Sequence, residues 1–313
     1  MPEVSFPCEV GSELEAYVAR LLDEAGVPNF IWAEPALSIL GVDTVSFFSG
    51  WVVPDECIEK AAQALDAANF PPCRQGRDGC SVFWERRAHP YPDHHWHTDL
   101  FYPPRLSPPG GAAMTCGVFL YRKSRLFWSF PDPPIGRPAP DDPYYMLTDD
   151  SRIEMGARSS RGPQYNIWYP VKMPTPGRYI EAMFRLALRD FEGVILYCHW
   201  LDEIDYLAGY LIEPGRTLKL EDIVEPFREW ARRLAFGRYA ERKGDLNAKK
   251  IQSEIFVEMA RNKQIPPVDD VRFDSWASLD DLLGQYSLPC DPEWSTPEEK
   301  KVYWNRPQDR RRR

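Results

Sequence analysis

The chain of 313 residues is 43% hydrophobic and 13% aromatic, and this apolar content is enough for a large core, which excludes a wholly disordered protein. Its length fits one large domain or two small ones. The formal net charge of −9 argues against broad electrostatic attraction to nucleic acid or to anionic lipid, so neither is expected as a partner.

Helix and strand signals alternate in the first seventy residues. Residues 12–25 have the apolar spacing of an amphipathic helix, with Ser12 at a position that can cap it. Residues 45–53 are rich in β-branched and aromatic side chains, which predicts one or two strands interrupted near Gly50. A short helix with one buried face is expected over residues 58–68, so strand and helix follow each other as in an α/β unit.

The middle of the chain favours strands and the last third favours helices. Three strand-like runs are separated by turns rich in proline and glycine: CSVFWERR at 80–87, HHWHTDLFY at 94–102 and AAMTCGVFLYRKSRLFWSF at 112–130. Thr175, as a cap, and Pro176 then begin the strongest predicted helix. Further helical segments are expected at 194–211, 225–239 and 249–261.

These elements predict a mixed α/β (α+β) protein in which helices flank a mixed sheet. We expect an N-terminal helix within residues 1–28, an α/β domain over 29–205, and a helical C-terminal region over 206–313 packed on that domain. Arginines dominate the last residues, and a disordered basic tail is expected near 306–313.

The seven cysteines are odd in number, scattered and without a CxxC pair, which indicates reduced thiols rather than a disulfide framework. Cys73 and Cys80 flank a loop rich in glycine and arginine and could pair or bind a metal, although ordinary free thiols are expected. The N-terminus lacks a basic signal-peptide region, and no apolar run reaches the ~18 residues of a membrane span. The sequence therefore predicts a cytoplasmic protein without a membrane partner.

Four of the five histidines lie in the segment HPYPDHHWHTDLFYPP. His97 and Asp99 form an HxD pair on a predicted strand, where positions i and i+2 point the same way. With the distant His199 they would complete the facial triad of a non-haem iron oxygenase, which makes Fe²⁺ one alternative. His199 lies in a helical pattern rather than on a late strand, so a structural histidine cluster is the default interpretation.

Several segments together resemble an uncharacterised filamentous-fungal family that is itself similar to the nucleotidyltransferase fold. The resemblance covers roughly residues 28–205. It rests on Leu-Ser-Ile-Leu-Gly-Val, Val-Val-Pro-Asp-Glu, Ala-Asn-Phe-Pro-Pro-Cys, the HTD strand, Leu-Phe-Trp-Ser-Phe-Pro, Met-Leu-Thr-Asp-Asp-Ser-Arg-Ile and Tyr-Pro-Val-Lys-Met-Pro-Thr-Pro-Gly-Arg. It implies a nucleotidyltransferase-like sheet flanked by helices.

The same resemblance implies a degraded active site. A working nucleotidyltransferase holds two Mg²⁺ ions with a DxD pair and a third carboxylate. Aligned on this pattern, the DxD positions fall on Phe48 and Gly50, and only Asp99 keeps an acid. Asp43 could replace a missing ligand only in a different strand register. Nucleotide transfer is therefore not expected, and no resident cofactor is predicted, with Mg²⁺ or Fe²⁺ as the alternatives.

The favoured hypothesis is a repurposed fold that binds or transforms a small-molecule ligand, a role that fits fungal specialised metabolism. An enzyme that does not transfer nucleotides is favoured; an active metal-dependent enzyme and a non-catalytic interaction protein are the alternatives. The oligomeric state is left open. Lys172 could meet an anion at a helix N-terminus or serve as a structural connector, and the connector is favoured. Candidate catalytic residues are His97 and Asp99, and candidate substrate-binding residues are Arg86, Arg87, Trp96, Tyr102, Trp128 and Lys172.

Overall fold

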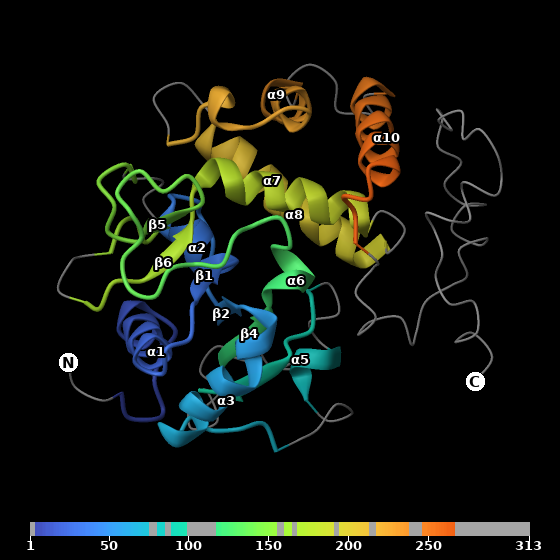
Figure 1. Ribbon diagram of the computed structural model, residues 1–313. Coiled ribbons are helices and arrows are strands. Elements are labelled where there is room, and N and C mark those ends of the chain that lie inside the picture. Colours follow the sequence, from blue (N-terminus) through green and yellow to red (C-terminus); the bar gives the residue numbers. More distant parts are fainter. Residues whose placement is uncertain are drawn as a thin grey trace, which may run out of the picture.

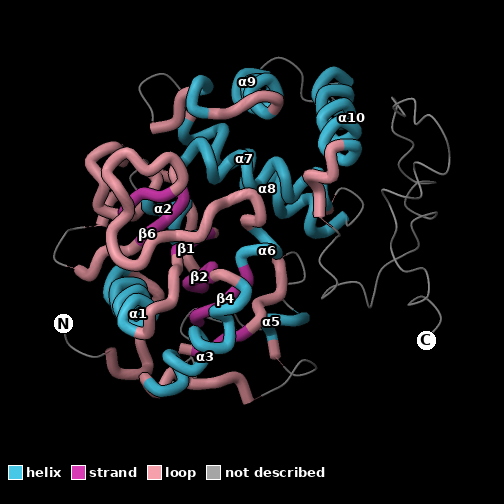
Figure 2. The backbone as a smooth tube through the Cα atoms, viewed as in Figure 1, coloured by secondary structure: helices cyan, strands magenta, loops and turns pink. Residues whose placement is uncertain are grey.

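The computed structural model is a mixed α/β protein, as the sequence predicts, with strands at the centre and helices around them (Figure 2). The residues that the structure describes are 4–74, 80–84, 89–98, 117–154, 160–164, 168–190, 194–212, 217–237 and 246–266. In the described part of the chain, no helix is both long enough and apolar enough to cross a lipid bilayer.

The main sheet has four strands in the order β1-β2-β4-β3. These are β1 Phe30–Trp32, β2 Phe48–Val53, β4 Gly117–Arg122 and β3 His94–His97. The central strands β2 and β4 run parallel, whereas β1 and β3 pair antiparallel at the two ends. Every residue of β2 is buried, as expected for a central strand covered on both faces. A separate antiparallel pair is formed by β5 Tyr145–Leu147 and β6 Lys172–Pro174.

One face of the main sheet is covered by α1 Ser12–Glu24 and by α3 Ile58–Ala67, which follows a 3₁₀ helix at Asp55–Cys57. Phe70, after α3, stacks on Tyr17 of α1 and lies edge-on to Trp96 of β3. The Trp96 indole also donates a hydrogen bond to Asp66 of α3 at 2.8 Å. These contacts fix the edge strand β3 against α1 and α3.

The other face is covered by α6 Lys123–Leu126 and by the helix pair α7 Pro176–Arg189 and α8 Val194–Leu211, which lies above the strands in Figure 1. Trp32 packs on Tyr121, with ring centroids 5.3 Å apart, and on Trp200 of α8 at 6.3 Å. The remaining helical elements are α2 Glu34–Ile39, α5 Ser81–Trp84, the 3₁₀ helix Leu220–Asp222, α9 Phe227–Gly237 and α10 Leu246–Arg261.

Four local expectations are wrong, and one concerns Lys123–Leu126, which were expected within a strand-like run but form the short helix α6. Residues 48–53 form one strand that continues through Gly50, because the β4 pairing runs along its whole length. Ser81–Trp84, expected as part of a strand, form the short helix α5. Ser12 is the first residue of α1 rather than its cap, and its hydroxyl accepts a hydrogen bond from Arg161 instead.

Glu203 of α8 carries a buried carboxyl group that faces Tyr179 of α7. The Tyr179 hydroxyl donates to Glu203 Oε2 at 3.0 Å and accepts the N–H of Ala33 at 2.8 Å. Burial is the main cause that raises the pKa of Glu203 to about 8; the Tyr179 hydrogen bond opposes the rise, and Glu34 and Asp202 add to it. The group is therefore protonated at neutral pH in the folded protein.

We expect Glu203 to make stability fall as the pH rises from the ordinary carboxyl pKa of 4.5 to about 8. In this window the unfolded chain has lost the proton and the folded chain keeps it, so each pH unit costs at most ~1.4 kcal/mol. Glu203→Gln imitates the protonated form and is expected to remove this part of the slope. Denaturant unfolding of both proteins across the window measures the difference, and equal slopes would contradict it.

Candidate metal centre

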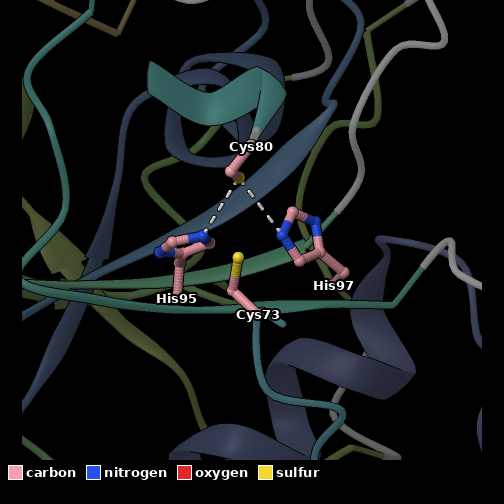
Figure 3. Close-up of side chains that lie close together, drawn as sticks. All are labelled: Cys73, Cys80, His95 and His97. Atoms are coloured by element: carbon pink, nitrogen blue, oxygen red, sulfur yellow. Dashed lines mark hydrogen bonds between the residues drawn. The ribbon is translucent and has the colours of Figure 1, made fainter. Parts of the chain in front are cut away.

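Two cysteines and two histidines converge beside the edge strand β3 (Figure 3). Cys73, Cys80, His95 and His97 each turn one ligand atom inward, and these four atoms all lie within 4.8 Å of one another. No other group of three or more histidine, cysteine or acidic side chains in the described ranges is close enough to share a metal ion.

The strand β3 supplies the two histidines. His95 and His97 are two residues apart, so their side chains leave the same face of the strand. Trp96 lies between them and faces the helices on the opposite side. His95 pairs with Phe119 of β4, and its ring lies 5.9 Å from the Phe119 ring.

Gly117 of β4 allows the backbone of β3 to approach closely where His97 is placed. Gly117 pairs with His97, and a Cβ atom on Gly117 would lie 2.1 Å from the carbonyl oxygen of Trp96. Real Cβ atoms do not come so close to a backbone oxygen, so any other residue would push the strands apart. The position of His97 therefore depends on this glycine.

Cys73 is positioned at the site because the two residues before it contact the backbone of β3. Pro72 forms an isolated antiparallel bridge to Trp96, and the N–H of His97 donates to the carbonyl oxygen of Pro71 at 3.0 Å. Cys73 is the next residue after this bridge and lies half-buried beside the histidines.

Cys80 reaches the site from a different segment, immediately before α5. Its Sγ atom lies 3.3 Å from His95 Nε2 and 3.4 Å from His97 Nε2. Phe83 of α5 packs edge-on against the His95 ring, with centroids 5.4 Å apart. Cys80 and His97 are buried, whereas His95 is half-buried.

The electrostatic setting keeps His95 neutral. Burial, together with the neighbouring His97 and His94, lowers the pKa of His95 to about 4. A neutral imidazole offers a nitrogen lone pair, which is the form that binds a metal ion. Thiolates and imidazoles in a compact four-member group are the donors that Zn²⁺ prefers, whereas Mg²⁺ requires oxygen ligands.

The other predicted site residues lie elsewhere or outside the described residues. Lys172 is buried, and its ammonium group binds the carboxylate of Asp23 at 3.0 Å. The Trp128 indole donates to the carbonyl oxygen of Gln264 at 3.2 Å. Trp96 faces the sheet side opposite the cluster. Four predicted residues fall outside the described residues: Arg86, Arg87, Asp99 and Tyr102.

One member of the predicted iron triad, Asp99, lies outside the described residues, whereas His97 and His199 are described. His199 lies on α8, a helix as the sequence pattern indicates, and its ring packs 4.5 Å from the ring of His89. The ligand group around His97 contains Cys73, Cys80 and His95 but not His199.

Phe48 and Gly50, aligned with the acid positions of a nucleotidyltransferase, are packed into the core. The Phe48 ring stacks on Phe119 with centroids 4.8 Å apart. A Cβ atom on Gly50 would lie 2.8 Å from Trp32 Nε1 and 3.0 Å from Phe48 Cε2. The neighbourhood is aromatic and tight, so a carboxylate at position 50 would have no space.

Gly50→Ala is expected to lower the free energy of unfolding by ~1–3 kcal/mol, because overpacking a buried site forces neighbouring rings to shift. The close atoms belong to two buried aromatic side chains rather than to a flexible surface chain. Gly11→Ala is the control, because nothing lies within 4 Å of its added Cβ. Denaturant unfolding measures both changes, and equal effects at the two positions would count against the packing explanation.

The sequence analysis predicts two parts of this metal centre separately, without placing them in one site. His97 is predicted as a site residue, and the pair Cys73 and Cys80 is noted as a possible metal or disulfide pair. The HxH spacing of His95 and His97 on one strand was the available signal for a shared site. The sequence does not predict the bridge between Pro72 and Trp96, which places the cysteine segment beside the strand.

Comparison with known proteins matched no family model, no curated protein and no solved structure. The resemblance to a fungal nucleotidyltransferase-like family therefore stays a prediction from the sequence.

Proposed function

We propose that the protein binds one Zn²⁺ ion through Cys73, Cys80, His95 and His97, and that this ion holds the cysteine segment to the edge of the sheet. The convergence of the four ligand atoms within 4.8 Å of one another is the observation that carries the proposal.

The distances suit a tetrahedral zinc site. Bonds of ~2.3 Å to sulfur and ~2.0–2.1 Å to nitrogen at tetrahedral angles put a sulfur and a nitrogen ligand ~3.6 Å apart. Cys80 Sγ lies 3.3 and 3.4 Å from the two histidine nitrogens. Side-chain adjustments of a few tenths of an ångström would complete the geometry.

A single ion also accounts for all four groups at once. Without a metal, the thiol of Cys80 has one hydrogen and can donate it to only one of the two imidazoles that approach its sulfur. Sulfur hydrogen bonds are weak, and they give no reason for Cys73 to join the group. Zinc replaces these weak contacts with four metal–ligand bonds.

Four protein ligands fill a tetrahedral coordination shell, which is the mark of a structural zinc site. The ligands come from three segments: the residue after the bridge between Pro72 and Trp96, the residue before α5, and β3. Among the described residues, β3 pairs with β4 on one side and is held on the other by the isolated bridge at Pro72. Zinc would reinforce this second attachment. Fixing these segments is the role we assign to the ion.

Metal analysis of the purified full chain tests the proposal. We expect one zinc per chain, and Co²⁺ substituted for zinc should show the intense visible bands of tetrahedral cobalt and a sulfur-to-metal charge-transfer band. Stoichiometric iron with no zinc would instead favour the oxygenase hypothesis with His97 as an iron ligand. The absence of any transition metal after loading with zinc would overturn the proposal.

Matched cysteine variants make the test specific. Cys73→Ser is expected to weaken zinc binding at least ~10-fold, because serine is a poor zinc ligand. Cys57→Ser is the control, since Cys57 is also half-buried but lies outside the cluster. Equal zinc affinity in the two variants would mean that the cluster is not the binding site.

A further inference from the structure

We propose that the same centre is a redox switch, in which a peroxide joins Cys73 to Cys80 in a disulfide and thereby releases the zinc ion. This inference rests on the proposed zinc site and adds its regulation. Two features of the cluster support it: the closeness of the two sulfur atoms and their unequal access to solvent.

The sulfur atoms are near enough to react with each other. Both belong to the group whose ligand atoms lie within 4.8 Å of one another, and Figure 3 shows both turned toward the centre of the cluster. A disulfide requires a sulfur separation of ~2.05 Å, so an approach of at most ~3 Å is needed. Zinc holds them at the intermediate spacing of its coordination shell.

The two cysteines differ in their access to solvent. Cys73 is half-buried and is followed by the exposed Arg74, whereas Cys80 is fully buried against the two imidazoles. A small oxidant in solution therefore meets the Cys73 sulfur first. Cys80 is shielded and close by, which is the arrangement of an attacking and a resolving cysteine.

Other described cysteines are poor competitors. Burial raises the pKa of Cys8 to about 12 and also raises the pKa values of Cys57 and Cys198, so these three remain thiols at neutral pH. The thiolate is the form that reacts with peroxide. Zinc coordination would hold Cys73 and Cys80 as thiolates.

The chemistry balances with hydrogen peroxide as the oxidant. The Cys73 thiolate attacks one peroxide oxygen, the O–O bond breaks, and a sulfenic acid and hydroxide form. The Cys80 thiolate then attacks the Cys73 sulfur, the S–O bond breaks, and a second hydroxide leaves as the disulfide forms. Two thiolates lose two electrons in total, the peroxide gains them, and Zn²⁺ loses both sulfur ligands.

Oxidation would exchange one cross-link for another. The zinc ion ties the cysteine segment to β3 through His95 and His97, whereas the disulfide ties Cys73 only to Cys80. The edge strand would keep its pairing with β4 but lose the metal attachment. We expect faster amide exchange at His97, whose N–H donates to the carbonyl oxygen of Pro71.

The test begins with the full chain loaded with zinc and confirmed to hold one ion. Hydrogen peroxide is added, released zinc is followed with a chromogenic chelator, and free thiols are blocked before the disulfides are mapped by mass spectrometry. We expect one zinc released and two thiols lost per chain, a Cys73–Cys80 disulfide, and recovery of zinc binding after reduction.

Different outcomes separate the switch from the site itself. Zinc that stays bound while peroxide oxidises other cysteines would overturn the switch and leave the zinc site intact. A chain that never binds zinc in the reduced state would overturn both. Cys57→Ser should release zinc at the wild-type rate, and a tenfold slower release in that variant would also contradict the assignment.

Discussion

Removal of zinc from the loaded protein is expected to lower its free energy of unfolding by ~4 kcal/mol, relative to protein kept at free zinc ~1,000 times the dissociation constant. The folded chain presents the four ligands together, whereas the unfolded chain does not, so zinc favours the folded state. Denaturant unfolding with and without a strong chelator measures the difference.

Two neighbouring histidines provide the matched control for this result. His95→Ala should abolish the zinc-dependent increase in stability, because it removes a ligand. His94→Ala should retain it, since His94 is the next residue on the same strand but lies near Glu59, 3.2 Å away, outside the cluster. A chelator that destabilises His95→Ala as much as the wild type would show that zinc acts elsewhere.

The elements that the sequence predicts best are those with long, regular apolar spacing. The helix after Thr175 is expected at Pro176 and is observed from Pro176 to Arg189, with its apolar stripe buried. Residues 12–25 and 58–68 also form helices at nearly the expected bounds. In each of these segments, burial of one face agrees with the local helical preference.

Short segments are predicted less well because tertiary pairing decides their structure. Ser81–Trp84 contain valine and aromatic residues that favour a strand, yet the segment is a single helical turn following Cys80. Residues 48–53 continue as a strand through Gly50, since pairing with β4 outweighs the weak preference of glycine for strands. Neither outcome could be deduced from local spacing.

The metal centre is also only partly predictable from the sequence. Its ligands follow the pattern C-x₆-C-x₁₄-H-x-H, which differs from the short C-x₂₋₄-C and H-x₃₋₅-H spacings of common zinc motifs. Strand alternation explains why His95 and His97 share a face, and this much is deducible. The approach of Cys73 depends on the bridge between Pro72 and Trp96, which only the folded backbone reveals.

Two roles are predicted for Lys172, anion binding and a structural connection, and its contacts in the structure bear on both. Its Nζ atom lies 3.0 and 3.3 Å from the two carboxylate oxygens of Asp23, and both side chains are almost fully buried. Burial lowers the pKa of Lys172, and the Asp23 carboxylate opposes this decrease. The contact joins β6 to α1, which is what a structural connector requires.

Lys172→Met is expected to destabilise the protein by ~3 kcal/mol, because it leaves the buried Asp23 carboxylate without its cation. The loss should fall at the low end of the usual range, since Asp23 still accepts hydrogen bonds from Asn29, Tyr169 and the N–H of Gly136. Denaturant unfolding at neutral pH measures the change. The ion pair between exposed Arg152 and half-buried Asp150 gives a control, because Arg152→Met should cost under ~1 kcal/mol.

A double-mutant cycle separates the ion pair from simple loss of packing. In the Lys172→Met background, Asp23→Asn removes the unpaired charge and keeps a hydrogen-bonding side chain of similar size. We therefore expect the double variant to be more stable than the sum of the two single effects predicts, by at least ~1 kcal/mol. Strictly additive effects would mean that Lys172 stabilises β6 through its aliphatic chain and that its charge contributes little.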